Sequence, residues 1–159
     1  MSEGTMKNSS RIVVGVDGSP SSRSALRWAV RQALLTGGTV DAIMAWHVPA
    51  AMAGYAWGQG PVGLDDVAER ETDTRKALDA VISEEVESAD RHLVTARAIN
   101  GHPAQALLNA AAGADLLVVG SRGHGAFAEA LIGSVSQYCV HHAHSPVLVM
   151  RGGPAYAAA

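Results

Sequence analysis

Cysteine and aromatic residues are scarce in this chain of 159 residues. Cys139 is the single cysteine, so no disulfide can form within the chain. Aromatic residues make up 4% of the sequence, so the core must be built from Val, Leu, Ile, Ala and Met. A domain of this length buries roughly 70% of the surface that its unfolded state exposes. We therefore predict one domain that folds without disulfides or a structural metal.

Long apolar runs and concentrated positive charge are also lacking. The most apolar long stretch, residues 42–57, is interrupted by His47, Pro49 and Gly54 and falls short of the roughly 20 residues that span a bilayer. Twelve Lys and Arg residues stand against 15 Asp and Glu, whereas a nucleic-acid binder concentrates basic residues on one face. Residues 1–10 are polar and lack the apolar region of a signal peptide. We expect no membrane segment, no nucleic-acid partner and a cytoplasmic location.

Short apolar runs alternate with longer amphipathic stretches along the rest of the chain. This alternation favours an α/β fold with a parallel sheet and helices on both faces. We predict a single doubly wound, Rossmann-like domain over residues 11–151 with strand order 3-2-1-4-5, between a flexible lead (1–10) and a flexible tail (152–159). The predicted strands are 11–16, 39–48, 93–99, 115–120 and 145–150; the predicted helices are 20–36, 64–88, 103–112 and 134–143.

Local signals support these helices. Ser19 and Pro20 are typical of a helix start, and Gly37 is typical of a helix end. Arg23, Arg27 and Arg31 recur every four residues on the first helix, and we expect them to form a solvated face. In doubly wound sheets, ligands bind beyond the carboxyl ends of the strands, where the strand order reverses.

A glycine-rich segment follows the fourth predicted strand. Gly120, Gly123 and Gly125 stand just past the strand end, where the lack of a Cβ allows close approach to a ligand. Gly133 and Ser134 begin the next helix and offer N–H groups at its positive end. These two groups of donors predict a two-part phosphate cradle, although a glycine-rich loop after a strand can also be a simple tight turn.

The cradle is neither of the two best-known phosphate motifs. The Walker pattern needs a lysine, which residues 120–134 lack. The dinucleotide fingerprint follows a first strand, whereas Asp17, Gly18 and Ser19 stand there in this chain.

The spacing Gly120-x2-Gly123-x9-Gly133-Ser134 resembles the nucleotide-binding pattern of the ATP-binding branch of the universal stress protein family. The resemblance runs from about residue 11 to residue 151. Further matching segments are VGVDGS (14–19), WHVP (46–49), GHP (101–103), ADLLVVGSRG (114–123) and SPVLVM (145–150).

The resemblance implies an adenine-nucleotide site spread over three strand ends. It places Asp17 on the ribose, the main chain of His47 and Val48 on adenine, and Gly120 on the ribose again. The remaining implied contacts are Gly15 and Val16 beside Asp17, the phosphate turn Ser121, Arg122, Gly123, His124 and Gly125, and the closing residues Gly133, Ser134 and Val135. Other interpretations stay open. Asp17 can be a helix cap, and His47 can be a strand-end histidine whose hydrogen bonds are made within the protein. The side chains of Arg122 and His124 can point into solvent.

The resemblance further implies a function. We expect ATP, with Mg²⁺, to act as the ligand of a stress-response switch, and a homodimer to form through the last strand, residues 145–150. The alternatives are a slow ATPase or adenylate-using enzyme on the same fold, and a binder of AMP or cyclic AMP. No catalytic residue is assigned, because phosphoryl transfer needs a positioned base and Glu129 is the only carboxylate near the cradle.

Two other interpretations are weak. His141, His142 and His144 suggest a metal site, but His141 and His142 are neighbours about 100° apart on a helix, and imidazoles at the negative end of a helix are a simpler account. A phospho-receiver domain needs an acidic pair after the first strand, but Gly18 follows Asp17. No metal ligand is assigned.

Overall fold

The computed structural model describes residues 9–47, 64–122 and 132–152. Five strands form a parallel sheet in the order β3-β2-β1-β4-β5, which confirms the predicted fold and strand order. The strands are β1 (Arg11–Gly15), β2 (Thr39–Trp46), β3 (Val94–Asn100), β4 (Leu116–Gly120) and β5 (Val147–Met150).

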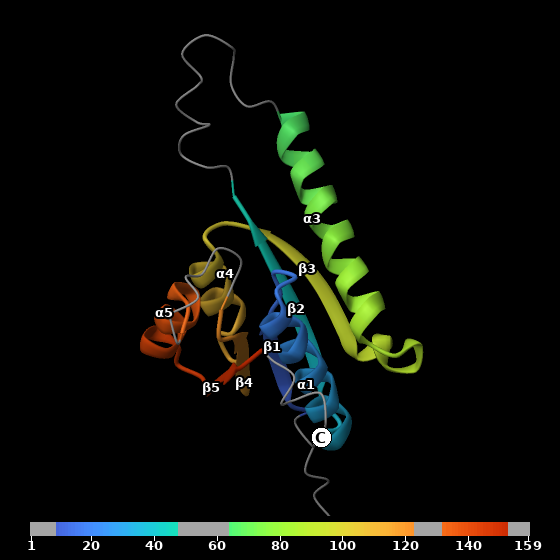
Figure 1. Ribbon diagram of the computed structural model, residues 1–159, viewed down its shortest axis with the longest axis vertical. Coiled ribbons are helices and arrows are strands. Elements are labelled where there is room, and N and C mark those ends of the chain that lie inside the picture. The colour runs from blue at the N-terminus through green and yellow to red at the C-terminus, as the bar shows by residue number, and fades with distance from the viewer. Residues whose placement is uncertain (1–8, 48–63, 123–131, 153–159) are drawn as a thin grey trace, which may run out of the picture.

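Helices cover both faces of this sheet (Figure 1). Helices α1 and α3 pack together on one face, and α4 and α5 pack together on the other. The helices are α1 (Pro20–Thr36), α3 (Leu64–Glu85), α4 (Pro103–Ala110) and α5 (Ser134–His142), with a short 3-10 helix, η2 (Ser88–Leu93), before β3.

The predicted helix ends of α1 are confirmed. The Ser19 side chain accepts a hydrogen bond from the Ser22 amide at the start of the helix. Gly37 follows the last turn with φ 67°, a left-handed conformation that glycine adopts without steric cost. Pro20 stands in the first turn, where a missing N–H leaves no intrahelical bond unmade.

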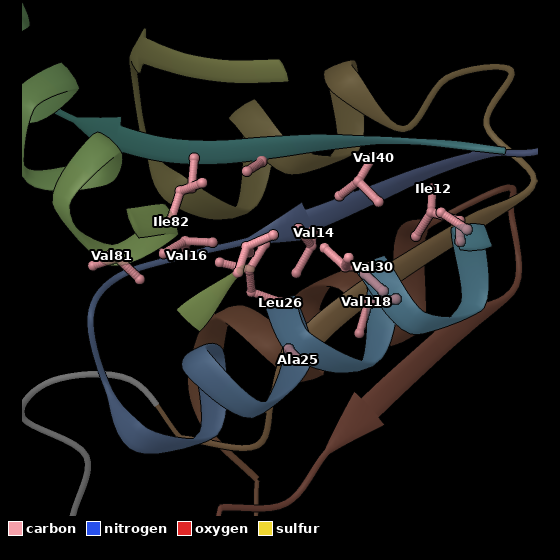
Figure 2. Packing of buried hydrophobic residues seen from close by; sticks show 14 of the residues in the cluster. Ile12, Val14, Val16, Ala25, Leu26, Val30, Val40, Val81, Ile82 and Val118 are labelled. Carbon is pink, nitrogen blue, oxygen red and sulfur yellow. The ribbon is translucent and has the colours of Figure 1, made fainter. Parts of the chain in front are cut away.

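Two apolar clusters fill the space on either side of the sheet. Figure 2 shows the first, in which Val14 of β1 faces Leu26 of α1, while Val81 and Ile82 reach in from α3. The second cluster contains Leu107 of α4 and Cys139 of α5. The few aromatic residues are replaced here by small aliphatic side chains, and alanines at positions 25, 29 and 33, which are fully buried, let α1 lie close to the sheet.

Several element boundaries differ from the prediction. Helix α3 ends at Glu85, three residues early, because the Arg91 side chain donates hydrogen bonds to the carbonyls of Ser83 (2.7 Å) and Val86 (3.1 Å) in the last turn. Strand β5 begins at Val147 instead of residue 145, because Pro146 has no N–H to donate to a ladder.

Two arginines of α1 bind the end of α3. The Arg23 guanidinium lies 2.6 Å from the Glu84 carboxylate and 3.1 Å from the Glu85 carboxylate, and Arg27 also pairs with Glu85. The expected solvated face is confirmed for Arg27 and Arg31, which are exposed, while Arg23 is half-buried. The Glu85 side chain is only 16% exposed, so water screens this ion-pair cluster less than it screens a pair on the open surface.

We expect Glu85→Gln to lower the free energy of unfolding by about 1 kcal/mol at neutral pH. Burial acts to raise the pKa of Glu85, but hydrogen bonds from Arg27 and Arg23 outweigh it, so the pKa lies below its ordinary value. A lowered carboxyl pKa stabilises the fold above the ordinary pKa, and this contribution is lost as the pH falls through the folded pKa. Urea unfolding across this pH range should show the difference between parent and variant shrinking on acidification.

Glu84→Gln is the matched control, because the Glu84 side chain is 60% exposed and, within the described ranges, pairs with Arg23 but not with Arg27. Equal losses for the two variants would contradict the role given to Glu85.

Candidate functional site

The candidate site lies at the carboxyl edge of the sheet, where the strand order reverses. Strand β1 is paired with β2 on one side and with β4 on the other. The chain runs from β1 to β2 and β3, and then returns to β4 on the opposite side. Because Val14 is level with Val118, the segments that follow β1 and β4 leave the sheet side by side, which is where ligands of doubly wound sheets bind.

The loop after β1 is held by its own polar groups. The Val16 amide donates to the Ile43 carbonyl at 2.8 Å, so pairing with β2 extends past Gly15. The carboxylate of Asp17 accepts a 2.9 Å hydrogen bond from the Ser19 amide, and Asp17 is exposed. Ser19, and not Asp17, caps α1, so the alternative of Asp17 as a helix cap is wrong.

The end of β4 lies against the first turn of α1. A Cβ on Gly120 would lie 2.8 Å from the backbone nitrogen of Ser22 and 2.9 Å from the carbonyl carbon of Ser21, so no larger residue fits without moving the helix. The Ser21 hydroxyl donates to the Arg122 carbonyl at 2.7 Å. The Ser121 amide donates to the Met150 carbonyl at 2.7 Å, which continues the pairing of β4 with β5.

The start of α5 is tied to the same strand end. The Gly133 amide donates to the Ser121 carbonyl at 2.6 Å, and the Ser136 hydroxyl donates to the Gly120 carbonyl. The N–H of Gly133 is therefore engaged, contrary to the expectation that it is a free donor. Ser134 is exposed and Val135 is half-buried.

Helix α5 differs from α1 and α4 in its capping. Its N-cap residue is Gly133, which has no side chain to accept a hydrogen bond, whereas Ser19 caps α1 and His102 caps α4. The first N–H groups of any helix lack intrahelical acceptors. The first turn of α5 therefore presents donors at the positive end of a helix dipole, which favours an anion.

The end of β2 forms the other side of this edge. His47 follows Trp46 and is exposed. The Gly101 amide donates to the Trp46 carbonyl at 2.8 Å, which joins the ends of β2 and β3. The rings of His47 and His102 lie 6.5 Å apart between centroids.

Most of the predicted site residues thus belong to segments that leave the same edge of the sheet. The residues within the described part of the chain are Gly15, Val16, Asp17, His47, Gly120, Ser121, Arg122, Gly133, Ser134 and Val135; Val48, Gly123, His124 and Gly125 lie outside it. The sequence analysis missed Ser21 and Ser136, whose hydroxyls fasten α1 and α5 to this edge. Single serines in helical stretches carry no signal that would have found them.

The histidine cluster and the cysteine show no sign of a reactive centre. Within residues 9–47, 64–122 and 132–152, no group of three or more His, Cys, Asp or Glu side chains is placed to hold a metal ion. His142 stacks on Tyr138, with 4.0 Å between ring centroids. Burial raises the pKa of the Cys139 thiol to about 11, so the thiol stays protonated at neutral pH and is a poor nucleophile. Over the same described ranges, no helix has the length and apolar character to cross a membrane.

The fold defines a doubly wound α/β protein whose strand order reverses at the candidate site. Residues 8–151 match the model of the universal stress protein family, and the chain belongs to this family. A universal stress protein of Mycobacterium tuberculosis is 32% identical over 154 residues, which cover 90% of this chain and 48% of that protein. The chain thus spans about half the length of the first curated relatives that it matches.

Solved structures show the same fold. The universal stress protein UspA from Lactobacillus plantarum is 23% identical with a TM-score of 0.63, covering 90% of this chain and 98% of that one. A universal stress protein in complex with cAMP is 27% identical with a TM-score of 0.56, covering 89% of this chain and 96% of that one.

We expect Gly120→Ala to destabilise the protein by about 1–3 kcal/mol, because the added methyl group meets backbone atoms of the first turn of α1. Gly15→Ala is the matched control. The nearest atoms to a Cβ there are the methyl groups of Leu107, at 2.9 and 3.2 Å, and a flexible side chain can move away. Thermal and urea unfolding measure both variants. A loss for Gly120→Ala no larger than that for Gly15→Ala would refute the tight packing of α1 on β4.

Proposed function

We propose that this chain binds an adenine nucleotide at the carboxyl edge of its sheet, with ATP and Mg²⁺ as the ligand, and that occupancy acts as a switch in a stress response. Membership of the universal stress protein family supports this proposal. So does the 27% identical universal stress protein that was solved in complex with cAMP.

The observation that carries the proposal is the uncapped N-terminus of α5 beside the end of β4. The hydrogen bonds of Gly133 and Ser136 hold this first turn against Ser121 and Gly120. Its remaining N–H groups therefore have a fixed place at this edge, and the N-cap residue Gly133 supplies no side-chain acceptor for them. Phosphate oxygens are suitable acceptors for such groups, because they carry the negative charge that the helix dipole favours.

Each part of the edge then has a role in the proposal. Asp17 accepts hydrogen bonds from the ribose, and the main chain at His47 and Val48 recognises adenine. The segment from Gly120 to Gly125 and the start of α5 enclose the phosphates, with Arg122 adding positive charge. Mg²⁺, when bound, neutralises phosphate charge and keeps most of its water shell.

The same hydrogen bonds connect the proposed nucleotide site to the edge of the sheet, where a second copy could bind. Helix α5 leads directly into β5, and Ser121 is hydrogen-bonded both to Gly133 and to Met150. A ligand that moves the start of α5 therefore acts on the strand at the edge of the sheet. We propose that β5 pairs with β5 of a second copy, as the last strand was expected to do, because an open strand edge has N–H and C=O groups without partners.

Ser134→Pro tests the phosphate role of α5. Proline removes the N–H of the first helical residue and is tolerated at that position. It also requires an extended residue before it, which Gly133 already is, with φ −70° and ψ 163°. We expect calorimetric affinity for ATP, AMP or cyclic AMP to fall about tenfold, as expected for the loss of a hydrogen bond to a charged group.

Ser134→Ala is the matched control, since it removes the hydroxyl and leaves the N–H. A folded Ser134→Pro variant that binds the nucleotides as tightly as the control would contradict the assignment of α5 as the phosphate site. A parent chain, stripped of nucleotide by mild denaturation, that binds none of the three ligands would refute the proposed function itself.

The dimer is tested by a proline on the open side of β5. The carbonyls of Pro146 and Met150 accept hydrogen bonds from β4, so the backbone groups of Val149 face the other way in a parallel ladder. We expect Val149→Pro to convert a dimer to a monomer in sedimentation at micromolar concentration, whereas Leu148→Pro interrupts the pairing with β4 and lowers stability. A parent chain that sediments as a monomer, with and without ATP, would contradict the proposal.

A further inference from the structure

A cavity of about 490 Å³ lies between β3 and α4, away from the start of α5. It exists because α4 packs over β1, β2 and α5, while β3 is the edge strand of the sheet. The side of β3 that faces α4 is therefore only partly covered. The volume is within the range of roughly 300–1,000 Å³ that is typical of small-molecule sites.

The cavity carries one positive charge, that of Arg97, without a carboxylate partner among the described residues. Arg11 and Arg97 line it, and no Asp or Glu is among its lining residues, all of which lie in the described part of the chain. Arg11 is fully engaged: its guanidinium pairs with Asp41 at 2.9 Å and donates to the carbonyls of Ala110 and Ala112. Arg97 has neither a hydrogen bond nor an ion pair to any described residue, and its guanidinium fork is free to bind an oxyanion.

Neutral donors stand around the same cavity. Asn109 accepts a 2.9 Å hydrogen bond from Gln105 through its side-chain oxygen, which leaves its NH₂ group to donate. The Nδ1 atom of His102 accepts from the Ala104 amide at 3.3 Å. The neutral His102 ring therefore carries its hydrogen on Nε2, which is a further donor. Asn100 also lines the cavity.

We propose that this cavity is a second binding site, distinct from the nucleotide edge, for a small ligand that carries a carboxylate or phosphate group. Arg97 binds the oxyanion through bidentate hydrogen bonds from its guanidinium. Asn109 and His102 donate further hydrogen bonds to the ligand. The apolar side chains of Ile99 and Ala106, which also line the cavity, contact the rest of the molecule. The inference goes beyond the proposed function and does not depend on it, because none of the cavity residues is among those assigned to the nucleotide.

The two sites are nevertheless near one another. His102 lines the cavity and its ring centroid is 6.5 Å from that of His47, which is part of the nucleotide edge. Gly101 also lines the cavity, and its amide donates a hydrogen bond to the carbonyl of Trp46. The experiment must therefore locate the bound anion as well as detect it.

Two-dimensional amide NMR of the labelled full chain provides that location. The probes are inorganic phosphate and malonate, a dicarboxylate, each titrated at constant ionic strength with chloride as the balancing anion. We expect saturable shifts at the amides of Asn100, Gly101 and Asn109. Arg97→Gln should weaken this binding about tenfold, and Arg31→Gln, which removes an equal charge from an exposed position on α1, should leave it nearly unchanged.

Shifts with malonate alone assign a carboxylate ligand, and shifts with phosphate alone assign a phosphate ligand. Saturable shifts with both probes assign a general oxyanion site. The proposal fails if neither probe gives saturable shifts at the cavity, or if shifts appear only at Ser134 and its neighbours. It also fails if Arg97→Gln, with an otherwise parental spectrum, weakens binding no more than Arg31→Gln does.

Discussion

The close contact between the first turn of α1 and the end of β4 is the constraint on which the candidate site depends. With no Cβ on Gly120, the backbone of Ser21 and Ser22 can lie against the strand. The Ser21 hydroxyl can then reach the carbonyl of Arg122. The loop after β1 and the segment after β4 are thereby held at a fixed separation. A ligand at this edge meets two backbone segments that are in place before it arrives.

A second set of bonds joins α5 to this frame. Gly133 binds Ser121 and Ser136 binds Gly120, so β4 holds α1 on one side and α5 on the other. Ser121 also donates to Met150 of β5. The strand end that would contact a nucleotide is therefore one hydrogen bond away from the edge strand. The proposed link between nucleotide binding and association of two copies rests on this short connection.

Much of the fold could be predicted from the sequence because its signals are local. Continuous apolar runs such as 115–120 indicate buried parallel strands, and Ser19, Pro20 and Gly37 mark helix ends through their own backbone preferences. The alternation of strands and helices then indicates a doubly wound sheet. The end of α3 was misplaced because it depends on Arg91, which binds carbonyls at the end of the preceding helix. The start of β5 was misplaced because the missing N–H of Pro146 was not weighed.

The candidate site was less accessible to sequence reasoning, for a physical reason. Glycine spacing shows where a backbone could approach a ligand. It does not show which N–H groups already donate hydrogen bonds within the protein. Gly133 has the expected position and yet donates to Ser121. The ion pairs of Arg23 and Arg27 with Glu85 likewise depend on how α1 packs against α3, which helical periodicity alone does not reveal.

The starts of α1, α4 and α5 at the carboxyl edge differ in how their first N–H groups find acceptors. In α1 the Ser19 side chain accepts from the helix, and in α4 the His102 ring does so. Each cap satisfies a donor that would otherwise need an outside acceptor. Glycine at the corresponding position of α5 has no side chain to serve in this way. Its amide holds the helix in place through Ser121. In the proposed site, a single glycine thus anchors the helix without capping it, and an uncapped positive helix end favours a phosphate group over a neutral ligand.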